Sequence, residues 1–316
     1  MLHFVRKAIV GDAISNKNYR CNPSILVRFR PQGDDIHSNI LIDVGKTFRE
    51  SAVRWFPYHE IRSIDSVVLT HGHADSIFGI DDLRSTQPRA QKRALPVYQS
   101  KECELVTRQV FSYLYPSSSE SKLISAAINE GSNKISKETE YVNQWETSLP
   151  IDETPSNLLP AKKVKRFVAN IDWKEMIPYE QFEASGLSII PIPVMHGEDM
   201  TCMGFLFGQT QKVCYLSDIS RMLPKTLQMI QDHGLIDLLI VDTIRMGPNL
   251  QPDGTHFCSD EAVSLCRQLR PTRTLLIGMA SLIDHDEAND KLREILDKEG
   301  LDVQLSYDGL KIDMWL

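Results

Sequence analysis

The segment Val67–Asp75 (VVLTHGHAD) constrains this 316-residue chain more than any other. Its apolar, β-branched start is typical of a buried strand, and the strand ends abruptly in His71, His73 and Asp75. We therefore expect two imidazoles and a carboxylate at the edge of a sheet. Histidine nitrogen and carboxylate oxygen are ligands that zinc takes in proteins. The segment predicts a metal site, and a plain polar turn after a strand is the alternative interpretation.

Side chains of the same kinds follow other strand-like segments. Asp43 lies at the end of an apolar run, His196 follows a long apolar strand, and Asp218 follows a third. His285 comes after the last strong strand signal of the chain. This recurrence of ligand-type residues after strands strengthens the prediction of a metal site.

Hydrophobic periodicity predicts strands alternating with helices, mostly in the second half of the chain. Strands are expected at 24–30, 39–44, 66–70, 96–98, 187–194, 204–207, 213–216, 238–241 and 274–277. Helices are expected at 101–115, 223–232, 259–269 and 286–299, and a closing hairpin at 303–306 and 310–313. The polar, turn-rich stretch at about 116–163 is interpreted as an insertion.

The order strand-Asp, T-H-x-H-x-D, strand-His, strand-Asp, C-terminal His resembles the metallo-β-lactamase superfamily. The strongest likeness is to the cyclic phosphodiesterase branch associated with carbon–phosphorus lyase pathways, and to eukaryotic relatives of that branch. It covers nearly the whole chain outside the insertion. Further segments that carry it are Asn18–Ser24 (NYRCNPS), Ile40–Arg49 (ILIDVGKTFR), Gly79–Arg84 (GIDDLR), Leu216–Ser220 (LSDIS) and Asp302–Lys311.

The resemblance implies an α/β fold, an αββα sandwich of two β-sheets flanked by helices. We expect one such domain over residues 1–316, interrupted by the insertion at 116–163. The family opens with a strand and a glycine-rich loop, and nothing before Asn18 matches them. The first strand of the fold is therefore expected to be missing.

The resemblance also implies a binuclear centre, with two Zn²⁺ ions expected and Mn²⁺ as the alternative metal. His71, His73 and His196 would hold one ion, and Asp218 would bridge to a second ion that also takes Asp75. Asp43 would orient a ligand histidine, or would instead cap the end of its strand.

Two departures from the family weaken the second position. Ser76 follows the motif aspartate, where many members have histidine, and the C-terminal ligand histidine would fall at Ser281. His285 would restore a ligand if it reached the centre. The alternative is that His285 lies in the first turn of the following helix, beside Asp286 and Glu287.

The resemblance implies hydrolysis by metal-activated water, because zinc lowers the pKa of bound water to about 7. Asp75 and His256 are the expected catalytic residues. His256 lies in Gly254–Phe257 (GTHF), just before a predicted helix. Its near-neutral pKa suits proton donation to the leaving group, whereas a surface loop histidine is the alternative.

These observations predict a metal-dependent hydrolase, a phosphodiesterase acting on a small cyclic or diester phosphate. One alternative is a degenerate member that binds metal or ligand without turnover. Another is an RNA-processing nuclease of the tRNA 3′-end type. That nuclease family adds a basic, glycine-rich arm, and the sequence offers in its place only Lys162–Arg166 (KKVKR).

The resemblance implies a small phosphate-containing substrate as the partner, and the composition is compatible with it. A net charge of −7 argues against charge-driven binding to long nucleic acid. The six cysteines contain no C-x-x-C pair, which favours a reducing compartment, and we expect a cytoplasmic protein. No apolar stretch approaches the roughly 20 residues that span a bilayer, so no membrane partner is expected.

Overall fold

The computed structural model describes residues 7–8, 10, 12, 14–31, 33, 36–87, 93–115, 168–247 and 250–316. The chain divides into two compact units, one formed by residues 1–112 and 169–316 and the other by residues 113–168. The predicted insertion at 116–163 lies outside the described residues. The strands of both sheets belong to the first unit. None of the helices in the described part is long and apolar enough to cross a membrane.

The first sheet has the strand order β1-β2-β3-β4-β5. Its strands are β1 (Ile25–Phe29), β2 (Ser38–Ile42), β3 (Ser66–Val68), β4 (Leu95–Gln99) and β5 (Ile171–Glu175). β1 and β2 are antiparallel, and the other neighbours are parallel. Ile42 pairs with Val68, so β2 and β3 end side by side. Asp43 and the His71 loop therefore leave the sheet at the same edge.

The second sheet has the order β12-β11-β10-β9-β8-β7-β6. Its strands are β6 (Phe182–Ala184), β7 (Leu187–His196), β8 (Met200–Phe207), β9 (Val213–Leu216), β10 (Leu238–Asp242), β11 (Arg273–Ile277) and β12 (Val303–Leu305). β6 to β9 pair antiparallel, and β9 to β12 pair parallel. Parallel strands that end together again place the residues that follow them at one edge.

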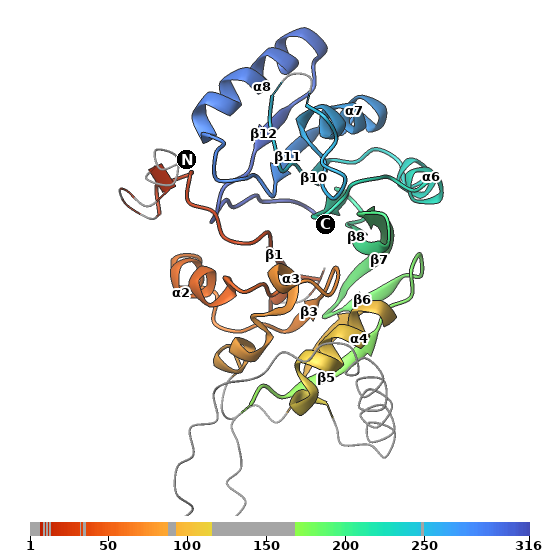
Figure 1. Ribbon diagram of the computed structural model, residues 1–316. Coiled ribbons are helices and arrows are strands. Elements are labelled where there is room, and N and C mark those ends of the chain that lie inside the picture. The colour runs from red at the N-terminus through yellow and green to blue at the C-terminus, as the bar shows by residue number, and fades with distance from the viewer. Residues whose placement is uncertain are drawn as a thin grey trace, which may run out of the picture. The chain divides into compact units, whose positions relative to one another are not determined.

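The two sheets pack face to face. Ile40, Ile42 and Val68 of the first sheet share a buried core with Phe205 and Tyr215 of the second. The helices α6 (Pro224–Asp232), α7 (Ser259–Leu269) and α8 (His285–Glu299) cover the outer face of the second sheet through a separate core (Figure 1). The helices α2 (Phe48–Tyr58), α3 (Ala74–Ile77) and α4 (Lys101–Val110) and the 3₁₀ helix η1 (Ile80–Ser85) flank the first sheet (Figure 1). The predicted αββα sandwich is confirmed.

The C-terminal hairpin predicted from the sequence is wrong. β12 pairs in parallel with β11, and residues 310–313 form no strand. The alternation that suggested a strand has another cause, because Leu310, Ile312, Met314 and Leu316 pack against the core between the sheets. An extended tail with one apolar side shows the same period of two as a paired strand.

Gly45 keeps the turn after β2 in contact with the loop that carries the predicted ligands. A Cβ atom at Gly45 would overlap with the backbone oxygen of Asp75. We expect Gly45→Ala to lower the free energy of unfolding by about 3 kcal/mol, at the upper end for an overpacked site, because backbone must move. Urea unfolding measures this loss.

Gly300→Ala is the control for that variant. Gly300 ends α8 at φ 67° with nothing within 4 Å of an added Cβ. Only the left-handed backbone conformation then opposes alanine, at about 1 kcal/mol. Equal losses in the two variants would contradict the steric role of Gly45.

Candidate metal centre

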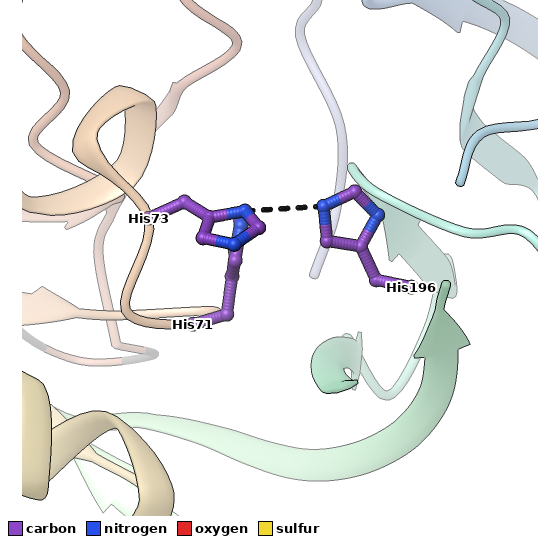
Figure 2. Close-up of side chains that lie close together, drawn as sticks. All are labelled: His71, His73 and His196. Atoms are coloured by element: carbon purple, nitrogen blue, oxygen red, sulfur yellow. Dashed lines mark hydrogen bonds between the residues drawn. The ribbon is translucent and has the colours of Figure 1, made fainter. Parts of the chain in front are cut away.

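Three histidines converge where the two sheets meet. His71 and His73 lie in the loop between β3 and α3, and His196 is the last residue of β7. Their ring centroids are 4.7, 5.0 and 5.2 Å apart. His73 Nδ1 and His196 Nε2 approach to 3.2 Å, and Figure 2 shows the first two rings facing the third. The centre is therefore assembled from both sheets.

The donor set fits a metal ion. One ring nitrogen from each of the three histidines lies within 4.8 Å of the others. His71 is 2% exposed, and its Nε2 is buried without a hydrogen-bond partner among the described residues. Burial lowers the pKa of His71 to about 4, and burial also lowers the pKa of His196. Neutral imidazoles with free lone pairs are the form that binds zinc or manganese.

Thr70 and Asp43 fix the orientation of the His71 ring. Asp43 Oδ1 accepts from the Thr70 backbone N–H at 2.8 Å, and Asp43 Oδ2 accepts from Thr70 Oγ1 at 2.8 Å. Since the Thr70 hydroxyl donates to Asp43, it accepts from His71 Nδ1 at 2.9 Å. The proton is thereby held on Nδ1, and Nε2 is left with its lone pair toward the centre. Asp43 acts through Thr70 and not on the ring directly.

Thr70→Val tests this arrangement, because valine keeps the volume and removes the hydroxyl. We expect a 10–100-fold loss of metal affinity, the usual cost of removing a partner behind a ligand histidine. Competition with a chromophoric chelator measures it. Thr70→Ser retains the hydroxyl and should bind metal nearly as well as the native protein. A similar loss in both variants would mean that packing, and not the hydrogen bond, is what matters.

Asp218 and His256 extend the cluster. Asp218 follows β9 and is 6% exposed, and one donor atom from each of His196, Asp218 and His256 lies within 4.8 Å of the others. His256 Nδ1 lies 2.7 Å from Asp242 Oδ2 and 3.8 Å from Asp218 Oδ1. Burial opposes the imidazolium, but the hydrogen bond and charge of Asp242 raise the pKa of His256 to about 8. Burial raises the pKa of Asp242 to about 7.

Asp242 was not among the residues predicted from the sequence. It ends β10, the apolar strand Leu238–Asp242 (LLIVD), and is 1% exposed. A carboxylate directly after a buried strand is the same signal that singled out Asp43 and Asp218. Applied to every strand, that signal would have found Asp242 as well.

The loop before α7 joins His196 to His256. The backbone oxygen of Thr255 accepts from His196 Nδ1 at 2.7 Å, and His256 is the next residue. Asp253 braces this loop by accepting from Thr255 Oγ1 at 2.6 Å and pairing with Arg245 Nη2 at 3.1 Å. One short loop therefore orients a candidate ligand and presents the candidate proton donor.

Asp75 and His285, two of the predicted ligands, stand apart from this cluster. Asp75 lies in the first turn of α3, but it belongs to none of the converging donor groups in the described part of the chain. Burial lowers the pKa of His71, and the charge of Asp75 opposes that shift only in part. His285 begins α8, where its Nε2 lies 3.0 Å from the Asn289 side-chain nitrogen and its ring packs edge-on against Tyr307.

The structure therefore places His285 where the alternative put it, in the first turn of a helix, and its ligand role stays a prediction. The physical reason is the course of the chain after β11. In the loop before α8, the backbone oxygen of Ile283 accepts a hydrogen bond from the Arg20 guanidinium at 2.8 Å. The next residue, Asp284, caps the N-terminus of α8. His285 is 3% exposed within that packing.

Comparisons with known proteins identify the fold that carries this site. Residues 38–139 and 143–279 match the β-lactamase superfamily domain. The structure of a new diphosphatase from the PhnP family is similar, with a TM-score of 0.64, 26% identity, and coverage of 96% of this chain and 90% of that chain. The short form of human tRNase Z shares the fold, with a TM-score of 0.53, 14% identity and 91% of each chain covered.

A curated relative is an octanoyltransferase from Porphyromonas gingivalis (strain ATCC BAA-308 / W83), 22% identical over 277 residues. The alignment covers 88% of this chain but only 42% of that protein, so its name describes a much longer molecule. The domain match over most of the sequence, the two packed sheets and the similarity to the PhnP-family diphosphatase agree with one another. The chain belongs to the metallo-β-lactamase superfamily, whose members are mostly metal-dependent hydrolases.

Proposed function

We propose that the protein is a metal-dependent phosphodiesterase that hydrolyses a small cyclic or diester phosphate. The observation that carries the proposal is the position of the His256–Asp242 pair beside the three convergent histidines, with 2.7 Å between His256 Nδ1 and Asp242 Oδ2. A hydrolase of phosphate esters needs both charge stabilisation at phosphorus and a proton for the departing oxygen. The similarity to a PhnP-family diphosphatase supports phosphate as the reacting group.

A Zn²⁺ or Mn²⁺ ion held by His71, His73 and His196 would supply Lewis-acid activation of water and of the phosphoryl group. The residues of the chain supply the rest. Because Nδ1 of His256 is bonded to Asp242, Nε2 is the nitrogen that carries a proton to the leaving oxygen. The buried Asp242 carboxylate holds the ring in place and stabilises its protonated form.

Charge and cysteine chemistry support a small substrate in a reducing compartment. The net charge of −7 opposes a long polyanion, so RNA processing remains the second choice despite the tRNase Z-like fold. All six cysteines are free in the structure, which supports a cytoplasmic location.

A substrate panel tests the proposal. Zinc- and manganese-loaded protein is assayed on bis(p-nitrophenyl) phosphate, a five-membered cyclic phosphodiester, a diphosphate diester and octanoyl thioester. We expect hydrolysis of the phosphate diesters and none of the thioester. The thioester is the matched control because a relative is named for octanoyl transfer. Preference for the thioester, or metal binding without any hydrolysis, would contradict the proposal.

A further inference from the structure

We propose that the centre holds a single metal ion, bound by His71, His73 and His196, and that the residues around Asp218 do not complete a second site. The inference rests on the proposed function in one respect only, that these three histidines are metal ligands. It departs from the binuclear centre expected from the sequence.

The first position has a complete set of protein ligands. The far nitrogen of His71 is engaged by Thr70 at 2.9 Å, and that of His196 by the backbone oxygen of Thr255 at 2.7 Å. Both rings therefore turn their Nε2 atoms inward, where His196 meets His73 at 3.2 Å. Three protein ligands with an open fourth position are the arrangement of hydrolytic zinc sites.

Few donors remain for a second ion. Among the described residues, the converging groups add only Cys202, Asp218 and His256 to the three histidines. Cys202 Sγ lies 3.7 Å from His71 Nδ1, the nitrogen that faces away from the centre. Cys202 is therefore on the wrong side of the His71 ring, and only Asp218 and His256 are left.

One nitrogen of His256, Nδ1, faces the carboxylates of both Asp242 and Asp218. Its Nδ1 lies 2.7 Å from Asp242 Oδ2 and 3.8 Å from Asp218 Oδ1. A nitrogen that donates its hydrogen to Asp242 has no lone pair for a metal. Nδ1 of His256 is therefore not a ligand, and Nε2 is the nitrogen assigned above to the proton of the leaving group.

No replacement donor comes from Ser76, Gly278 or Ser281. Ser76 Oγ is directed at His71 Nδ1, 3.3 Å away, and is buried. Gly278 follows β11, and a Cβ there would lie 2.5 Å from Asp242 Oδ1, so the position has neither a donor nor room for one. Ser281 is exposed. Asp218 with Asp75 falls short of the three or four protein ligands of a zinc site.

Metal stoichiometry tests the inference without an activity assay. The full chain is stripped with a chelator, titrated with Co²⁺ and with Zn²⁺ in a calorimeter, and analysed for metal after desalting. We expect one equivalent in the native protein and in two variants, His256→Gln and Asp75→Asn, because neither residue binds the ion. Both are partly solvent-accessible, so the variants are expected to fold.

Two equivalents in the native protein, falling to one in either variant, would overturn the inference and identify the lost residue as a ligand. No binding at all would also overturn it. So would loss of the single equivalent in His37→Ala, because that variant removes an exposed histidine outside the centre. The proposed function fails separately, since a protein with one ion and no hydrolysis would keep the inference and lose the phosphodiesterase. A protein that binds two ions and hydrolyses phosphodiesters would overturn the inference and support the proposed function.

Discussion

His73→Ala is expected to abolish metal retention and to lower phosphodiester hydrolysis more than about a hundredfold. The imidazole contributes one of three nitrogens that converge within 4.8 Å, and removing it leaves two protein ligands. Losing a partner behind a ligand costs 10–100-fold, so losing the ligand itself should cost more. Elemental analysis of the purified variant and initial rates on bis(p-nitrophenyl) phosphate measure the two effects.

His73 is the best histidine for this experiment because its side chain is exposed, whereas His71 is almost fully buried. The alanine variant should therefore keep the melting temperature of the metal-free native protein. His37→Ala, which removes an exposed histidine outside the centre, should keep both metal and activity. Hydrolysis that survives in His73→Ala without bound metal would remove the metal from the mechanism.

His256→Gln is expected to lower turnover by about 10²–10⁴-fold, the range for a lost general acid, while metal content stays unchanged. Burial lowers the pKa of His256, but Asp242 outweighs burial and raises that pKa to about 8. The imidazole therefore carries its proton below pH 8. The turnover of the native protein should be highest there and should fall as the pH rises through about 8.

Asp242→Asn separates this role from packing. The amide keeps the shape of the carboxylate but removes the charge that raises the pKa of His256. The alkaline fall in turnover should then move to lower pH in the variant. An unchanged pH profile in Asp242→Asn, or loss of metal in His256→Gln, would show that His256 is not the proton donor.

Much of the framework of the centre follows from the sequence by one rule. A short apolar run in the sequence predicts a buried strand, and a polar residue directly after such a run lies at a sheet edge. That rule placed His71, His73, His196 and Asp218 at the ends of their strands, and helix signals near 259–269 matched α7. Buried strands and amphipathic helices are specified locally, so their patterns survive in the sequence.

The remaining features depend on contacts that no local pattern records. β6 has three residues and is stabilised as an edge strand beside β7. α2 contains Pro57 and a mixed outer face with Val53 exposed, so its periodicity is weak. The position of His285 depends on Arg20, which lies more than 250 residues earlier and anchors the loop before α8. Contacts between residues far apart in the sequence fix such positions, and the local spacing of residues does not reveal them.

The two-sheet origin of the three histidines also bears on how the protein gains and loses its ion. His73 and His196 are 123 residues apart, and the backbone oxygen of Thr70, beside them, accepts from Met203 N of β8 at 3.0 Å. Neither sheet alone carries the set, so a growing chain could not capture the ion until β7 had folded against β3. A bound ion would then link the two sheets. It would raise the free energy of unfolding by about 2.7 kcal/mol when the free metal concentration is a hundred times its Kd. A shortage of metal would therefore lower the stability of the folded protein as well as its hydrolytic activity.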